Sequence, residues 1–218
     1  MKHFTAIFDM DGTMIDNTPY HFKSWQAFYK NHHLGEISRE AYYRDISGVP
    51  IIDTMRRLYP DDDEAQLKQL VNEKEAYYRK IYEPFLAPIN GLENFLTELK
   101  SAGIKMAIAS SATMGDIDFI LHKIPVRKNF EAIIDGSRVT KGKPNPQIFL
   151  KAAHDLNARP EDCVVFEDSL AGIKAANAAG MKVVAITTGH KAADLQPSSL
   201  VIDDYSTLTV ARLTALFD

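Results

Sequence analysis

The apolar positions of this chain include short runs that predict buried β-strands. A run that is short, apolar and bounded by polar or turn residues is typical of a strand covered on both faces. The runs are Phe4 to Phe8, Met106 to Ala109, Cys163 to Phe166 and Lys182 to Ile186.

A helical pattern precedes each of the last three strands. Apolar residues recur at helical spacing, and glycine or a capping residue marks where a helix ends or begins. The expected helices are residues 92–99, with Gly103 as their stop; 145–156, with Asn145 as the cap and Pro146 at the first position; and 171–179, followed by Gly180. Alternating helices and buried strands predict an α/β fold with a Rossmann-like parallel sheet and helices on both faces.

The pattern changes between about Pro19 and Tyr82, where the chain is rich in aromatic and charged residues and predicts long helices. One face of the last of these helices is apolar or aromatic at i, i+3 and i+4 spacing, which is typical of an amphipathic helix. That face holds Leu67, Leu70, Val71, Tyr77, Tyr78 and Ile81. We therefore expect a separate helical region between the first strand and the second.

Composition narrows the class of protein. The 218 residues are 45% hydrophobic and 25% charged, which is typical of a globular protein. The net charge of −4 argues against a nucleic-acid partner, which usually selects a basic surface. The one cysteine, Cys163, lies in an apolar run and is expected to be a buried structural thiol.

Two further features concern location. The first apolar stretch stops at Asp9, which makes it too short for a signal-peptide core. No apolar run approaches the ~20 residues of a membrane span. We expect a cytoplasmic protein that acts as a monomer and has neither a membrane nor a nucleic acid as partner.

Polar side chains cluster just beyond the predicted strands. Asp9 and Asp11 follow the first strand, and the other clusters are Ser110 and Ser111 after the second, Lys143 before the helix that begins near Asn145, and Glu167 with Asp168 after the third. The carboxyl ends of parallel strands meet at one edge of a sheet, where ligands bind. Carboxylates with a lysine and a hydroxyl suit Mg²⁺ and a phosphate, because hard cations prefer oxygen ligands and offset carboxylate repulsion.

Taken one at a time, these residues have ordinary explanations. Asp9 and Asp11 could form a turn, Ser110 could cap a helix, and Lys143 could be an exposed loop lysine. Glu167 and Asp168 could begin a helix, where its dipole favours negative charge. It is their joint occurrence, in order and at strand ends, that favours a catalytic site. Residues 136–143 do not form a phosphate-binding P-loop, because the spacing is one residue too long and Pro144 replaces the required hydroxyl residue.

In this order and combination, the residues resemble the four motifs of the haloacid dehalogenase superfamily of aspartyl phosphotransferases. The matching segments are Asp9-Met10-Asp11-Gly12-Thr13, Ser110, Lys141-Gly142-Lys143-Pro144 and Glu167-Asp168-Ser169. The chain is most similar to the β-phosphoglucomutase-like phosphatases of that superfamily, in Lys143-Pro144-Asn145-Pro146 and in Phe166-Glu167-Asp168-Ser169-Leu170-Ala171-Gly172-Ile173. The resemblance implies a sheet domain of residues 1–16 and 86–218 and an inserted helical cap of residues 17–85.

The resemblance also implies roles for the carboxylates. Asp9 would be the nucleophile, and Asp11 would protonate the leaving oxygen and then deprotonate the attacking water. Mg²⁺ would be held by Asp9, by the main-chain carbonyl of Asp11 and by the acidic pair. Of that pair, Asp168 would be the direct ligand and Glu167 would support it.

The remaining motif residues would bind the phosphoryl group. Ser110, Ser111 and Lys143 would hold its oxygens and stabilise the charge that builds up on them. His21, in the cap, would link cap closure to the positioning of Asp11. The alternative for His21 is a hinge histidine in ordinary packing.

One departure from the family bears on the substrate. The mutases grip a second phosphate with a Lys-Gly-x-x-Arg loop in the cap, and Ser47 and Ile51 stand where its two cations would be. Isoleucine cannot supply the hydrogen bonds of an arginine clamp. We therefore expect a phosphatase of a small phosphorylated metabolite such as a sugar phosphate. The alternative is a β-phosphoglucomutase-type mutase, in which Arg56 or Arg57 compensates.

Two other classes of protein fit less well. A dehalogenase needs neither the metal nor the acid at Asp11. A receiver-like signalling domain would accept phosphate on an aspartate without being an enzyme, but it would be smaller and would lack the helical insertion.

Overall fold

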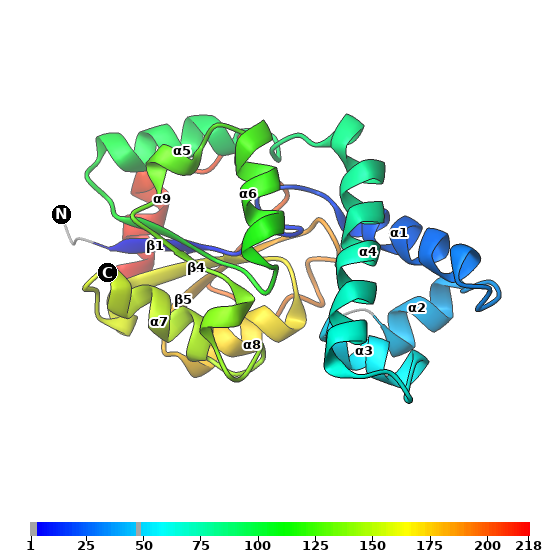
Figure 1. Cartoon of the computed structure of the whole chain (residues 1–218). Helices are drawn as coiled ribbons and strands as arrows, with labels where there is room; N and C mark the ends of the chain where they lie inside the picture. Colours follow the sequence, from blue (N-terminus) through cyan, green and yellow to red (C-terminus); the bar gives the residue numbers. More distant parts are fainter. Residues whose placement is uncertain (1–3, 47–48) are drawn as a thin grey trace. The chain divides into compact units, whose positions relative to one another are not determined.

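The chain forms two compact units in the computed structural model, which describes residues 4–46 and 49–218, except for the side chain of residue 43. The sheet unit consists of the described residues up to Asp16 together with Ala87–Asp218. The helical unit is Asn17–Leu86 (Figure 1).

A six-stranded parallel sheet forms the centre of the sheet unit, in the order β3-β2-β1-β4-β5-β6. Its strands are β1 (Thr5–Phe8), β2 (Met106–Ala109), β3 (Ala132–Ile134), β4 (Cys163–Glu167), β5 (Lys182–Ile186) and β6 (Leu200–Ile202). In the register of the central strands, Ile7 pairs with Ala107 on one side and with Val165 on the other. All residues of β1, β2 and β4 are buried, as expected for parallel strands covered on both faces.

Helices cover both faces of the sheet, with α7 and α8 on one side and α5 and α6 on the other (Figure 1). The helices of this unit are α5 (Leu92–Ser101), α6 (Met114–Lys123), α7 (Gln147–Asp155), α8 (Leu170–Ala178) and α9 (Val210–Thr214). Side chains alternate between faces along a strand. Ile7 accordingly packs with residues of α7 and α8, whereas Phe8 stacks on Phe166 with ring centroids 4.3 Å apart. The predicted α/β fold with a parallel sheet is confirmed.

The structure also adds to the expected elements and shifts some of their ends. Strands β3 and β6 were not predicted, because three residues give too little pattern to recognise. Helix α7 begins at Gln147 rather than at Pro146, although the Asn145 side chain does accept a hydrogen bond from the Gln147 N–H (3.1 Å). Helix α8 begins at Leu170, where the Ser169 hydroxyl caps it by accepting from the Gly172 N–H (3.0 Å).

The helical unit has a separate apolar core. Its helices are α1 (Thr18–Asn31), α2 (Arg39–Asp45), α3 (Ile51–Leu58) and α4 (Glu64–Tyr82). The core gathers Trp25, Phe28, Ile37, Tyr42, Ile46, Met55 and Leu67. A capping box at Asp63 and Gln66 starts α4 by satisfying N–H groups that have no partner within the helix. In the described part of the chain, every helix is too short or too polar to cross a membrane.

Candidate active site

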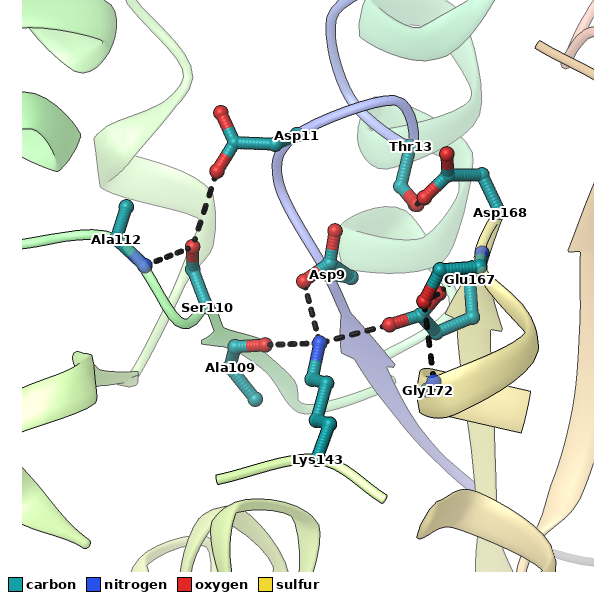
Figure 2. A network of polar contacts seen from close by, with 11 residues as sticks. Asp9, Asp11, Thr13, Ala109, Ser110, Ala112, Lys143, Glu167, Asp168 and Gly172 are labelled. Carbon is teal, nitrogen blue, oxygen red and sulfur yellow. Dashed lines mark hydrogen bonds and ion pairs between the residues drawn. The ribbon is translucent and has the colours of Figure 1, made fainter. Parts of the chain in front are cut away.

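Three neighbouring strands bring their polar ends together at one edge of the sheet. Asp9 follows β1, Ser110 follows β2, and Glu167 is the last residue of β4, so the central position of β1 places them side by side. Backbone hydrogen bonds continue the ladder to this point, because the Asp9 N–H donates to the Phe166 carbonyl (3.0 Å) and the Ser110 N–H to the Ile134 carbonyl (3.0 Å). The loop before α7 adds Lys143 from a distant part of the sequence (Figure 2).

Lys143 lies at the centre of the site. Its Nζ contacts Asp9 Oδ1 at 2.5 Å and Glu167 Oε1 at 2.7 Å, and it also donates to the Ala109 carbonyl at 3.4 Å (Figure 2). Its Nζ also lies 4.9 Å from the centre of the Phe149 ring. Burial lowers the pKa of Lys143, but the Asp9 and Glu167 carboxylates raise it by more. The net shift is upward, so this lysine stays charged.

The carboxylates outnumber this lysine. Asp9, Glu167 and Asp168 are all buried, and their oxygens lie within 4.8 Å of one another. Burial raises the pKa of Asp9 to about 8 despite the opposing effect of Lys143, and the Glu167 and Asp11 charges add to the rise. Burial, with the charges of Glu167 and Asp9, raises the pKa of Asp168 well above its usual value. Burial thus makes ionisation of these carboxyl groups costly unless a further cation is present, and a set of buried oxygen donors of this kind fits a divalent cation.

Two glycines make room for the carboxylates. A Cβ on Gly172 would lie 1.7 Å from Glu167 Oε1, and a Cβ on Gly12 would lie 2.1 Å from Asp168 Oδ2. Gly12 also has a φ of +78°, which favours glycine. Glu167 is held further by Ser169, whose N–H and hydroxyl donate to Oε2 at 2.7 and 2.9 Å.

Asp11 lies on the other side of the site, towards β2. Its Oδ2 accepts a hydrogen bond from Ser110 Oγ at 3.4 Å, and Ser110 Oγ in turn accepts from the Ala112 N–H at 3.0 Å (Figure 2). Thr13 Oγ1 donates to Asp168 Oδ1 at 3.4 Å, so the turn after β1 also contacts the acidic pair. Sequence reasoning did not select Thr13 as a site residue.

Ser111 differs from the other residues expected at the site. It is exposed, and its side chain takes part in none of the hydrogen bonds found among the described residues. The helix after this loop is capped instead by Thr113, whose hydroxyl accepts from the Asp116 N–H (3.2 Å). The structure therefore brings together Asp9, Asp11, Ser110, Lys143, Glu167 and Asp168, and leaves Ser111 at the exposed rim of the sheet unit.

His21 belongs to the helical unit, where it packs against a buried lysine. Its ring stacks on Tyr78 with centroids 4.2 Å apart, and its Nδ1 lies 3.3 Å from Lys74 Nζ. Its Nε2 lies 3.3 Å from Asn17 Nδ2. Burial, helped by the Lys74 charge, lowers the pKa of His21 well below its usual value, so the ring is neutral near pH 7.

Sequence reasoning did not select Lys74, although the pattern of apolar residues along α4 indicates that this lysine lies on the buried face. Leu67, Val71, Lys74 and Tyr78 share one face of α4 at helical spacing, and Lys74 is the one charged residue among these four. Only 2% of Lys74 is exposed, and its Nζ contacts Glu75 Oε1 at 3.0 Å. A lysine on an apolar face, where it must find buried partners, is the sign that would have found it.

Comparison with known proteins identifies the family. The family model described as haloacid dehalogenase-like hydrolase matches residues 6–186. The chain is 32% identical to a β-phosphoglucomutase of Bacillus subtilis, over 95% of this chain and 92% of the relative. It is also 32% identical to a phosphorylated carbohydrates phosphatase of Thermotoga maritima, over 81% of this chain and 82% of the relative.

A solved structure supports the same assignment. A haloacid dehalogenase family IA hydrolase of Entamoeba histolytica superposes with a TM-score of 0.89 at 26% identity, over 98% of this chain and 99% of that one. Fold and relatives together define an enzyme of phosphate-ester chemistry. The chain belongs to the haloacid dehalogenase-like hydrolases, among relatives that are phosphatases and phosphosugar mutases.

Proposed function

We propose that this enzyme is a Mg²⁺-dependent phosphatase that hydrolyses a small phosphorylated metabolite, such as a sugar phosphate, through an aspartyl-phosphate on Asp9. The observation that carries the proposal is the buried cluster in which Asp9 contacts Lys143 and shares a cation-sized group of oxygens with Glu167 and Asp168. The side chain of Asp11 lies on the other side of Asp9 and faces Ser110 (Figure 2).

The proposed reaction has two steps. A carboxylate oxygen of Asp9 attacks phosphorus, the bond from phosphorus to the ester oxygen breaks, and Asp11 gives its proton to the departing alcohol. Asp11 then takes a proton from water, whose oxygen attacks the phosphorus of the aspartyl-phosphate and releases Asp9 with inorganic phosphate. Lys143 and Ser110 hold the phosphoryl oxygens during both steps, and Ser111, which is exposed beside Ser110, would join them only when substrate is bound.

Mg²⁺ fits the donor set of this site. Asp9, Asp168, the main-chain carbonyl of Asp11 and, in support, Glu167 would hold it. When bound, the cation offsets the repulsion between the carboxylates, keeps Asp9 ionised and neutralises charge on the phosphoryl group. The raised pKa of Asp9 supports this role, since a carboxyl group with a pKa of about 8 is a poor nucleophile at neutral pH until a cation lowers its pKa.

The helical unit is proposed to be the cap that selects the substrate and excludes water from the site. Within it, the segment that would hold the second phosphate of a mutase substrate is poor in cations. Ile51 is the first residue of α3, and Ser47 lies outside the described residues. An enzyme without cations to bind a second phosphate is better suited to a monophosphate substrate than to a bisphosphate intermediate.

The two arginines that could compensate already have partners. Arg56 pairs with Asp53 and Glu64, each at 2.8 Å, and Arg57 donates to the Asp45 carbonyl at 2.7 Å. Recruiting either side chain to a second phosphate would require breaking these contacts. This favours the phosphatase, whereas the similarity to a β-phosphoglucomutase keeps a phosphosugar mutase as the second candidate.

The decisive experiment is a phosphate-release screen of the purified enzyme over a panel of phosphorylated metabolites, with Mg²⁺ and with a chelator. We expect release from one or more sugar or polyol monophosphates with Mg²⁺, none with the chelator, and recovery when excess Mg²⁺ is restored. In a parallel reaction, β-glucose 1-phosphate is supplied with a bisphosphate primer. Formation of glucose 6-phosphate without free phosphate would establish the mutase instead.

Other reaction classes give distinct results. Release of halide from a haloacid without Mg²⁺ would indicate a dehalogenase, and a single long-lived phosphorylation per chain would indicate a receiver. We also propose that the enzyme acts as a monomer, which size-exclusion chromatography with light scattering tests directly.

A further inference from the structure

The turn that carries Asp11 is held by hydrogen bonds from two directions. From within the turn, the Met10 carbonyl accepts the N–H groups of Thr13 (3.2 Å) and Met14 (2.8 Å). These bonds fix the N–H sides of two successive peptide groups, those that join Gly12 to Thr13 and Thr13 to Met14.

The carbonyl sides of the same two peptide groups accept side-chain hydroxyls from the far end of the chain. Thr188 Oγ1 donates to the Gly12 carbonyl, and Tyr205 Oη donates to the Thr13 carbonyl at 2.9 Å. Gly12 and Thr13 are buried, and in the described part of the chain no backbone N–H donates to either carbonyl. Each of the two peptide groups is therefore held at both ends.

Both donors lie in the sheet unit, beyond the ends of two of its strands. Thr188 lies in the loop directly after β5, and Tyr205 follows β6 and is 2% exposed. The Tyr205 ring packs against Phe95 and Phe166, with centroids 5.7 and 5.9 Å away. Burial, together with the charges of Asp9 and Asp168, raises the pKa of Tyr205 well above its usual value. The phenol thus remains protonated and able to donate.

Gly12 explains why such restraint is needed. A side chain at this position would overlap the Asp168 carboxylate, so the residue next to Asp11 has to be glycine. Glycine restricts its own backbone less than any other residue does. Within the turn, the Gly12 N–H donates to the Ile15 carbonyl (2.8 Å), and the hydroxyls of Thr188 and Tyr205 restrain the two peptide groups that follow.

We propose that Thr188 and Tyr205 are positioning residues whose hydroxyl groups hold the Gly12 and Thr13 carbonyls and so orient Asp11 for proton transfer. This inference rests on the proposed function, in which Asp11 is the general acid and base. Neither hydroxyl touches the reacting atoms in this scheme. Loss of either hydroxyl should lower kcat and leave KM nearly unchanged, because substrate binding does not depend on the orientation of the Asp11 side chain.

The leaving group gives a readout that a purely structural role would not change. An alkyl phosphate, such as the best sugar phosphate from the screen, needs a proton donated to its departing oxygen. p-Nitrophenyl phosphate needs that proton far less, since nitrophenolate is a weak base. Misdirection of Asp11 should therefore slow the first step, transfer of the phosphoryl group to Asp9, more for the alkyl phosphate than for the nitrophenyl ester. Hydrolysis of the aspartyl-phosphate, in which Asp11 is the base, is the same step for both substrates, so the comparison uses single turnovers that report the first step alone.

The test compares Thr188→Val, Thr188→Ser and Tyr205→Phe with the wild type on both substrates. With enzyme in excess over substrate, we expect Thr188→Val and Tyr205→Phe to lower the single-turnover rate of alcohol release about tenfold for the alkyl phosphate, and that of nitrophenolate release no more than about threefold. Thr188→Ser keeps the hydroxyl and should restore most of the loss. Thr97→Val is the matched control, because Thr97 Oγ1 also donates to a carbonyl, that of Glu93 (2.8 Å), but on α5; it should keep wild-type kinetics.

The outcomes separate this inference from the proposed function. A wild type that hydrolyses no phosphate ester overturns the proposed function. If the wild type is active and the Thr188→Val and Tyr205→Phe variants react at the wild-type rates, only the positioning role is overturned. Equal losses in the single-turnover rates of the two substrates, or a serine variant as slow as the valine variant, also overturn it. Thermal unfolding followed by circular dichroism identifies any variant whose loss comes from misfolding, and the correctly folded members of the set then decide.

Discussion

The two units of this protein bury charge in opposite ways. The sheet unit places Asp9, Glu167 and Asp168 around one lysine, Lys143, so negative charge is in excess. The helical unit buries a lysine instead, Lys74, and surrounds it with partners. These are the Glu75 carboxylate at 3.0 Å, the His21 ring nitrogen at 3.3 Å, and the faces of Trp25 and Tyr78 at 5.5 and 5.6 Å.

The difference shows which buried charges are neutralised by the protein's own side chains. Carboxylate, neutral imidazole and aromatic faces stabilise the Lys74 ammonium without any ligand. Lys143 compensates the carboxylates of the sheet unit only in part, and burial keeps the pKa values of Asp9 and Asp168 raised. We therefore expect changes in the sheet-unit cluster to act first on activity, and changes around Lys74 to act first on stability.

The largest effect should follow Asp9→Asn. An amide cannot form the aspartyl-phosphate, so kcat should fall by about 10³-fold or more. Stability should respond differently. The pKa of Asp9 is raised by folding, so its burial costs stability once pH exceeds the ordinary value, and that cost grows up to about pH 8. With a chelator at neutral pH, the variant should unfold at an equal or higher temperature than the wild type.

Asp155→Asn is the matched control for this change. Asp155 pairs with Arg138 at 2.7 Å on the surface of the same unit, so its loss should leave kcat unchanged. Enzyme kinetics gives kcat and calorimetry gives the unfolding temperature of Asp9→Asn, Asp155→Asn and the wild type. An Asp9→Asn variant that retains turnover would contradict the assignment of the nucleophile.

The next effect concerns the space around Glu167. Gly172→Ala would place a Cβ 1.7 Å from Glu167 Oε1, which forces the carboxylate away from Lys143. We expect kcat to fall about 10- to 100-fold and the half-saturating Mg²⁺ concentration to rise. The reason is that hydrogen bonds to a metal-binding carboxylate, such as that of Lys143 to Glu167, hold it in the orientation that binds the metal. A Mg²⁺ titration of activity measures both quantities.

Gly115→Ala tests whether any alanine near a helix start has the same result. Gly115 is the second residue of α6, and a Cβ there would meet nothing closer than 3.8 Å. This variant should keep wild-type activity and gain a few tenths of a kcal/mol in stability from helix propensity. Equal losses in the two variants would show that the Glu167 contact is not the cause.

The smallest effect belongs to the helical unit and depends on pH. His21 has a lowered pKa in the folded protein, so near pH 6 the unfolded chain binds a proton that the folded chain does not. Stability should therefore fall as pH decreases from about 7.5 to 5.5, and His21 should account for about 1 kcal/mol of that fall. His21→Gln should lose this part of the pH dependence.

Trp25 provides the measurement. It is the one tryptophan of the chain and is 3% exposed in the core of the helical unit, so its fluorescence follows the unfolding of that unit in urea. Wild type and His21→Gln are compared at both pH values. If the two proteins depend on pH in the same way, His21 is not the neutral, partly buried group that its contacts with Lys74 and Tyr78 indicate.

The sheet unit could be read from the sequence to a large extent. Buried parallel strands are continuous apolar runs, and the first polar residue after each run, such as Asp9 or Ser110, falls at the sheet edge as a matter of geometry. Lys143 could be named as a candidate from its place before a predicted helix, but its contacts with Asp9 and Glu167 came only with the fold, because loop residues carry no periodicity. The pattern does not distinguish Ser110 from Ser111, although the structure buries the first and exposes the second; the binding of phosphate by Ser111 stays a prediction.

Contacts between distant parts of the chain could not be predicted in this way. Thr188 and Tyr205 reach a turn that lies 176 and 192 residues earlier, and neither stands in a recognisable motif. The His21–Lys74 contact likewise joins two helices whose register is set by packing. The apolar face of α4 did contain a sign of Lys74, but its partners only emerge from the fold.

The central claim, that Asp9 carries the phosphoryl group, can be tested by trapping the intermediate. Enzyme turning over its best substrate with Mg²⁺ is quenched in acid, digested and analysed by mass spectrometry. We predict that the peptide containing Asp9 gains the mass of one phosphoryl group, that the gain disappears once substrate is exhausted, and that Asp9→Asn never shows it. Turnover with the phosphoryl group on another residue, or with none on the protein at any time, would contradict the account.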